Sequence, residues 1–176
     1  MPVTLFEKTS PVSLPVFLRK LDKRSHWGHS DDPRSLRIDT AVAEVFDPCE
    51  KPFSFFRAAN DEELYRIVVG LNSLRASLSQ QIDFVAFTEF EILSAGIQLS
   101  VTAGETSCHS ANRLHVDASA PSITSIRQLC DDVFNANRQA FRVTKSEASD
   151  IASYMRAYGC EAVVFATSCQ CIQPPA

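Results

Sequence analysis

The chain has 176 residues, of which 45% are hydrophobic and 22% charged, and its formal net charge is −4. This composition is typical of one globular domain and excludes a collagen-like chain, a low-complexity chain and a coiled-coil rod. The acidic balance argues against a nucleic-acid partner, since nucleic-acid binders gain affinity by neutralising phosphates. The first 37 residues carry more basic than acidic side chains, which would direct an acidic partner to this segment, and an ordinary solvated surface is the alternative.

No apolar run reaches the roughly 18 residues that a membrane-spanning helix requires, and the N-terminus lacks the regions of an export signal. The six cysteines are even in number, but a chain of this length can build a core without disulfides. Cys130 and Cys160 lie in or beside apolar patterns that are typical of buried reduced thiols. We therefore expect a soluble cytoplasmic protein without a membrane contact.

Prolines at positions 2, 11, 15, 33 and 48 interrupt the start of the chain. We expect an irregular N-terminal arm over residues 1–50, which packs on the domain or extends from it. Within this arm, the segment Val16–Asp22 predicts one short helix. The polar segment Ser25–Asp32, which holds the only tryptophan, is typical of a loop.

Strand and helix patterns alternate between residues 51 and 167. The expected strands are Phe53–Arg57, Ile82–Phe87, Ile97–Thr102, Leu114–Asp117, Phe141–Val143 and Ala162–Ala166. The expected helices begin at the capping residues Asn60, Thr88, Ser122 and Thr144, and Glu63, Glu91 and Glu147 stand where a capping box requires an acidic residue. Gly96 and Gly159 mark helix ends.

This alternation predicts an α+β fold, with an α/β fold as the alternative. We expect a single domain in which three or four helices cover a mixed β-sheet. The core spans residues 51–167, and a flexible tail covers residues 168–176. The five glycines form neither a dinucleotide-binding fingerprint nor a Walker A motif, which argues against nucleotide hydrolysis and dinucleotide redox chemistry.

Four candidate functional residues lie close together: Cys108, His109, His115 and Asp117. His115 and Asp117 share one face of an expected strand, because side chains alternate along a strand. The set has the residue types of a zinc site. It also fits a thiol hydrolase in which Cys108 is the nucleophile, His115 the base and Asp117 the orienting carboxylate. No complete motif accompanies these residues, so a plain loop cysteine, a surface histidine and a turn aspartate are the alternative.

Two further thiols, Cys169 and Cys171, stand in the tail. Together they can bind zinc or another soft metal, and Cys108, His109 or Cys160 could complete a tetrahedral site. The alternative is two incidental thiols on a flexible end.

Trp27, with His26 and His29 beside it, is the candidate binding surface, since tryptophan is enriched at interface hot spots. Alternatively, Trp27 folds back over the domain. We expect a small cytoplasmic accessory or regulatory protein that binds another protein and needs no cofactor. The alternative function is a metal- or thiol-assisted hydrolase, with zinc as the candidate metal, at Cys108, His109, His115 and Asp117.

Overall fold

The computed structural model describes residues 3–9, 12–22, 24–27, 37–45, 53–73, 78–104, 106, 108–119, 121–136, 138 and 140–159. In these residues, the strands are β1 (Val16–Leu21), β2 (Ser54–Ala58), β3 (Ile82–Thr88), β4 (Gln98–Val101), β5 (His115–Ser119) and β6 (Phe141–Val143). The α-helices are α1 (Arg37–Val45), α2 (Asp61–Asn72), α3 (Glu89–Ser94), α4 (His109–Asn112), α5 (Ile123–Asn135) and α6 (Lys145–Tyr154). Single turns η1 (Phe6–Thr9), η2 (Arg24–Trp27) and η3 (Met155–Gly159) complete the set.

The strands form one sheet in the order β4-β5-β2-β1-β3-β6. Each pair of neighbours in this order is antiparallel. The expected α+β class is therefore confirmed, in its antiparallel form rather than with the parallel pairs of an α/β fold. Strands β4 and β6 lie at the two edges.

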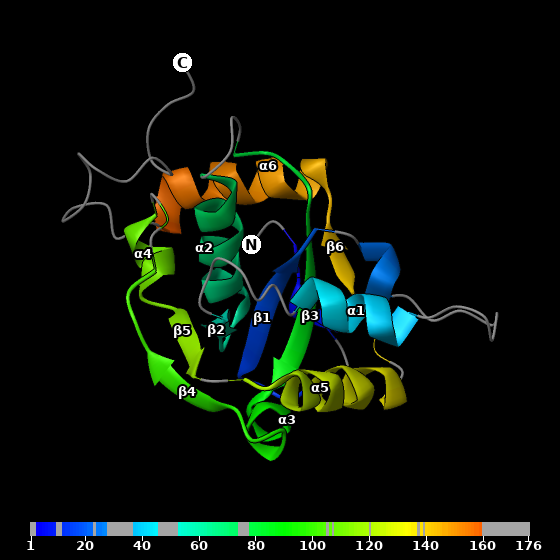
Figure 1. Cartoon of the computed structure of the whole chain (residues 1–176). Coiled ribbons are helices and arrows are strands. Elements are labelled where there is room, and N and C mark those ends of the chain that lie inside the picture. The colour runs from blue at the N-terminus through cyan, green and yellow to red at the C-terminus, as the bar shows by residue number, and fades with distance from the viewer. Residues whose placement is uncertain are drawn as a thin grey trace.

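Helices cover both faces of the sheet, so the fold has three layers (Figure 1). Alternate residues of the central strands point to opposite faces and enter two separate hydrophobic clusters. Val16, Leu18 and Phe84 pack with α2 and α6 in the first cluster. Phe17 and Phe87 pack with α1 and α5 in the second. Two buried faces explain why the runs Val16–Leu18 of β1 and Phe84–Phe87 of β3 are apolar without interruption.

Strand β1 corrects one expectation, because the helix predicted over Val16–Asp22 is wrong. Leu, Arg and Lys favour helices in isolation, but this segment pairs with β2 on one side and with β3 on the other. The backbone hydrogen bonds of two neighbours and burial on two faces outweigh the local preference. The expected N-terminal arm therefore supplies a central strand, and its residues 37–45 form α1.

The capping signals of the sequence are confirmed. The Thr88 and Thr144 side chains accept from the backbone N–H groups of Glu91 and Glu147, and these glutamates bond back to complete both boxes. The Asn60 side chain caps α2 by accepting from the Glu63 N–H. The Glu63 carboxylate accepts from the N–H of Ala59, and not from that of Asn60 as a complete capping box requires. Gly96 ends α3 with a φ of 76°, the left-handed conformation that favours glycine.

Several expectations concern residues outside the described ranges: His29, Cys160, Cys169, Cys171, the strand Ala162–Ala166 and the tail 168–176. Within the described part of the chain, no helix is long and apolar enough to cross a membrane.

Candidate functional site

Trp27 is buried, so the prediction that it forms an exposed anchor is wrong. Its side chain is 0% exposed. The indole stacks on Phe134, with ring centroids 6.0 Å apart, and meets Phe87 edge to face at 6.2 Å. The physical reason is that the second cluster lies under η2, where a large aromatic ring gains more by burial than by exposure. The alternative, in which Trp27 folds back over the domain, is confirmed.

His26 has a structural contact next to the tryptophan. Its Nδ1 lies 3.0 Å from Oε2 of Glu44 on α1. The same carboxylate accepts from the backbone N–H of Asp22 through Oε1, at 2.7 Å. Glu44 of α1 thus connects the end of β1 with η2. This contact within the chain explains the position of the His26 side chain without a partner protein.

Cys108 is also buried, at 0% exposure, and precedes the first residue of α4. Its Sγ lies 3.2 Å from Oγ of Ser110. Helix α4 packs so closely on α2 that a Cβ at Gly70 would lie 2.5 Å from Cβ of Ala111. This close approach needs the glycine and seals the thiol inside the first cluster. The alternative of a plain loop cysteine is therefore wrong as well, because Cys108 belongs to the core.

His115 and Asp117 share one face of β5, as their spacing predicts. The two side chains are 3.9 Å apart, between Nε2 and Oδ1, which is beyond hydrogen-bond reach. Instead, Nδ1 of His115 lies 2.8 Å from Oγ1 of Thr102, and its ring packs edge to face on Phe56. The imidazole is thus oriented by a threonine and not by the expected carboxylate.

The described residues contain no group of three or more His, Cys, Asp or Glu side chains that could hold a metal ion. Cys108, His109, His115 and Asp117, the candidate zinc ligands, therefore do not come together as such a group. Cys130, predicted to be a buried thiol, is buried, and this burial raises the pKa of its thiol to about 12. Such a thiol is held in its unreactive protonated form.

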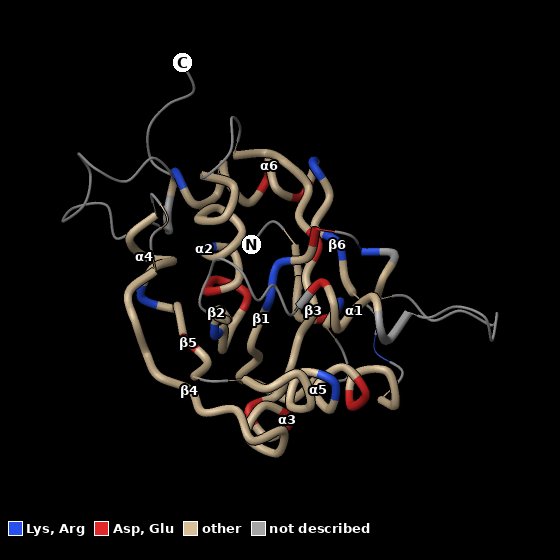
Figure 2. The backbone as a smooth tube through the Cα atoms, viewed as in Figure 1, with Lys and Arg blue, Asp and Glu red and all other residues tan. Residues whose placement is uncertain are grey.

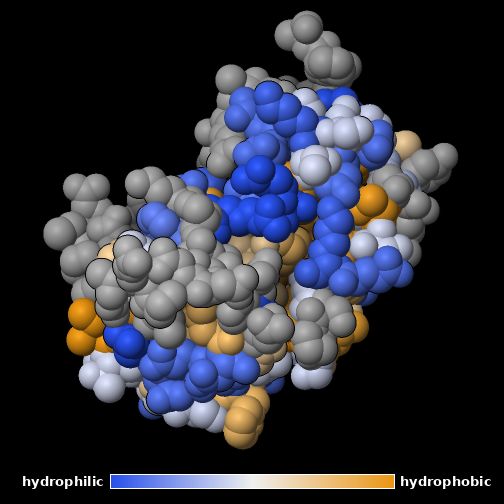
Figure 3. All heavy atoms as spheres, turned by 90° about the vertical axis from the view of Figure 1, so that its right-hand side faces the viewer, coloured by the Kyte–Doolittle hydropathy of each residue, from blue (hydrophilic) through white to orange (hydrophobic). Residues whose placement is uncertain are grey.

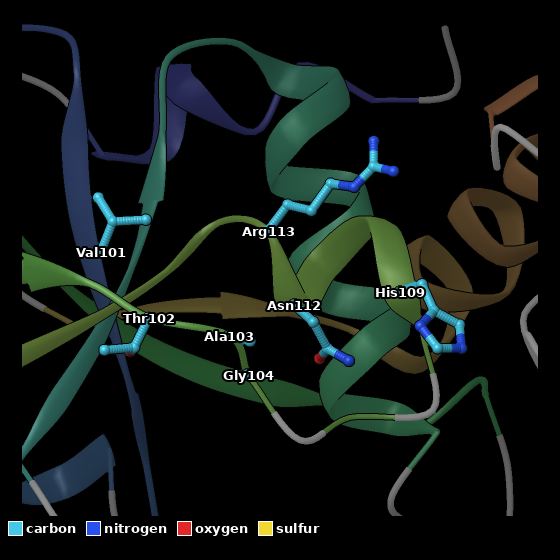
Figure 4. A pocket seen from close by; sticks show the side chains of 7 residues that line it. All are labelled: Val101, Thr102, Ala103, Gly104, His109, Asn112 and Arg113. Carbon is cyan, nitrogen blue, oxygen red and sulfur yellow. The ribbon is translucent and has the colours of Figure 1, made fainter.

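An open groove of about 560 Å³ lies between the end of β4 and α4. It is lined by Val101, Thr102, Ala103, Gly104, His109, Asn112 and Arg113. Figure 4 shows that the side chains of His109, Asn112 and Arg113 point in different directions and do not converge on one point. Asn112 is fixed by Thr106, whose backbone N–H donates to Oδ1 at 2.8 Å. The groove therefore lacks the convergent polar groups of a catalytic site.

Among the residues that the structure describes, β4 is an edge strand, because only β5 pairs with it. The Thr102 N–H donates to the His115 carbonyl oxygen, which fixes the even-numbered residues as the ones that bond to β5. Leu99 and Val101 consequently direct their N–H and C=O groups away from the sheet. Val101 is 81% exposed. No Asp, Glu, Lys, Arg or Pro occurs from Ile92 to Gly104, and Figure 2 shows this stretch in tan along β4.

Helix α3, which leads into β4, exposes two apolar side chains. Phe90 is 79% and Leu93 54% exposed, and residues three apart share one face of a helix. On the other side of the helix, Ile92 is buried in the second cluster. In Figure 1, α3 lies between the start of β4 and α5. We name Phe90, Leu93, Leu99 and Val101 together the α3–β4 surface.

Sequence reasoning missed the α3–β4 surface, although part of its signal was present. The charge-free stretch after Ile92 was visible, but the edge position of β4 depends on the strand order.

In comparison with known proteins, no family model, no curated protein and no solved structure matches the chain.

Proposed function

We propose that this chain is a small cytoplasmic accessory or regulatory protein that binds another protein through α3. The observation that carries the proposal is the exposure of Phe90 and Leu93 on one face of a fixed helix. Aromatic residues are enriched in protein–protein interfaces, where they fill pockets of the partner. The net charge of −4 favours a protein over a nucleic acid as partner.

The α3 helix is held rigidly, which favours recognition. Its N-terminus has a complete capping box at Thr88 and Glu91. Arg138, which is buried, forms an ion pair with Glu91 and donates to the Ala86 carbonyl oxygen at 3.1 Å. A side chain presented on such a support loses little conformational entropy on binding. Phe90 is therefore a preorganised anchor.

The alternative hydrolase function has no comparable support. Cys108, its candidate nucleophile, is buried against Ser110, and the candidate base His115 contacts Thr102. A nucleophile and its base need to lie within hydrogen-bond reach of each other and of a substrate. The binding function is therefore the one that we propose for this chain.

The test is site-specific photo-crosslinking in cells. The full chain carries a photo-reactive amino acid at Phe90, and a matched chain carries it at Ser149, an exposed position on α6. We expect a defined adduct with another protein at position 90 only, identified by mass spectrometry. Addition of Leu93→Asp should suppress that adduct, because a charge would enter the apolar contact. Equal labelling from positions 90 and 149, or none from position 90, would contradict the proposed function.

A further inference from the structure

We propose that a second copy of this chain occupies the open edge of β4, so that two β4 strands pair antiparallel about a two-fold axis. The inference rests on the proposed function only in treating the α3–β4 surface as an interface. It assigns the β4 part of that surface to a second copy and leaves α3 for the other protein.

The backbone of β4 favours this pairing. Along an antiparallel edge strand, the backbone groups of successive residues point alternately toward the neighbouring strand and away from it. The Thr102–His115 hydrogen bond shows that even-numbered residues of β4 point toward β5, so only Leu99 and Val101 offer outward N–H and C=O groups along β4. Between two copies, an outward residue can pair only with an outward residue. Leu99 of one copy then exchanges two hydrogen bonds with Val101 of the other, and the two-fold axis repeats this pair. Ser100 lies on the axis and faces Ser100 of the second copy.

Neighbouring registers fit less well. A shift toward the N-terminus would pair Val101 with Ile97 of the second copy. The Ile97 N–H already donates to the Ile92 carbonyl oxygen at 3.2 Å, so it is not available. A shift toward the C-terminus would pair Leu99 with Ala103, which lies beyond the end of the strand. The register centred on Ser100 uses both outward residues of each copy.

In this register, the side chains of one β4 strand are complementary to those of the other. Leu99 and Val101 lie on the sheet face that carries the buried Ala118 and Val116 of β5. They meet each other across the new interface, so the 81% exposed Val101 gains an apolar neighbour. On the opposite face, Gln98 meets Thr102, and Ser100 meets Ser100. Apolar side chains thus contact apolar ones, and uncharged polar side chains contact polar ones.

The distribution of charged residues also favours pairing at β4. Two copies with a net charge of −4 each repel one another, and like charges directly opposite each other destabilise a strand pair. The stretch from Ile92 to Gly104 holds no charged residue, so pairing here adds no local repulsion. Edge strands of monomeric proteins are commonly protected by lysine, proline or a bulge against such pairing, and β4 has neither lysine nor proline.

The interface is short, which predicts a weak and reversible dimer. Five paired residues from each copy, Gln98 to Thr102, bury an area at the low end of known interfaces, so we expect a dissociation constant on the order of 10–100 μM. One dimer would carry two α3 helices, and two linked copies of a binding surface bind a repeated partner more tightly than one.

The test measures association of the purified full chain by analytical ultracentrifugation. We expect a monomer–dimer equilibrium at protein concentrations on the order of 10–100 μM, around the expected dissociation constant. Val101→Lys should weaken it at least about tenfold, because a lysine on the edge opposes pairing, whereas the matched Ser149→Lys should leave it unchanged. Circular dichroism melting confirms that each variant folds. A chain that stays monomeric, or a dimer that Val101→Lys does not affect, would overturn the inference.

A disulfide trap tests the register. The non-hydrogen-bonded Ser100 pair would bring two Cα atoms within disulfide distance. Ser100→Cys should therefore give a covalent dimer on mild oxidation, with the 100–100 link identified by mass spectrometry. Gln98→Cys, whose partner is Thr102, should give no 98–98 link. A 98–98 link without a 100–100 link would overturn the register. Because the crosslinking at Phe90 does not depend on β4 pairing, either proposal can fail while the other stands.

Discussion

Strands β4 and β6 lie at opposite edges of one sheet, yet their surroundings differ. At β6, Lys8 donates to the Arg142 carbonyl oxygen at 3.2 Å and forms an ion pair with Glu147. Arg142 itself forms a bidentate pair with the buried Asp83 of β3, at 2.8 and 2.9 Å. At β4, no charged residue stands on the strand or within two residues of either end. Figure 2 shows blue and red segments around β6 and none along β4.

This difference indicates which edge of the sheet can pair with another strand. Charged side chains on an edge strand must lose water before another strand can pair, so they protect the edge. Figure 3 shows the side of the molecule that lies on the right in Figure 1, where hydrophilic side chains gather in the upper half and hydrophobic side chains also reach the surface. The same chain thus protects β6 and leaves β4 uncharged, which supports an interface at β4.

The largest effect is expected at the support of the α3–β4 surface. Arg138→Ala removes the buried partner of Glu91 and the donor to the Ala86 carbonyl oxygen. We expect the free energy of unfolding to fall by about 2 kcal/mol, because a buried charge and a buried acceptor lose their partners. Chemical denaturation measures the change. Arg127→Ala, which breaks an exposed pair with Asp131, is the control and should change stability by less than about 0.5 kcal/mol. Equal effects of the two variants would show that Arg138 does not support α3.

A smaller effect is expected at the protected edge, and it depends on pH. Burial by itself would raise the pKa of Glu147, but its hydrogen bonds with Lys8 and Thr144 outweigh burial and lower the pKa below the ordinary 4.5. A lowered folded-state pKa means that the charged glutamate stabilises the fold above pH 4.5 and that this contribution is lost as the pH falls further. Glu147→Gln should therefore cost up to about 1 kcal/mol at neutral pH and progressively less in acid.

The measurement compares the free energy of unfolding of Glu147→Gln and of the wild-type chain at neutral pH and at pH values below 4.5. In a Lys8→Met background, the difference between Glu and Gln at position 147 should shrink, because the main charged partner is absent. A difference that grows in acid would contradict the lowered pKa and the protective role of the pair.

The smallest effect on stability is expected at β4. Val101→Thr keeps a β-branched side chain and changes only an exposed position. The free energy of unfolding of the monomer should therefore differ from that of the wild-type chain by less than about 0.5 kcal/mol. The same substitution should weaken dimerisation, since the apolar contact with Leu99 is lost. Thermal melting at low protein concentration and sedimentation at high concentration separate the two effects. A large loss of stability in the dilute monomer would show that Val101 serves the fold rather than an interface.

Local signals in the sequence determined much of the secondary structure. The threonine and asparagine caps, the glutamates three residues later and Gly96 act through hydrogen bonds within a few residues. Such interactions depend on sequence neighbours alone, so they can be recognised without the fold. The strands around Phe55, Phe84 and Phe141 were predictable for a similar reason, because apolar residues bounded by turn signals indicate a buried strand.

Contacts between distant segments decided the rest. Val16–Leu21 became a central strand because β2 and β3 supply partners on both sides. Trp27 became a core residue because Phe87 and Phe134, which are distant in the sequence, both pack against its indole. Cys108 became inaccessible because Gly70 lets α4 approach α2. In the described part of the chain, the edge position of β4 follows from the strand order. The sequence by itself determined caps, helix ends and apolar patterns, since these act over a few residues. Only the tertiary structure decided which side chains are buried and which strand keeps a free edge, because burial and pairing join residues that the chain separates widely.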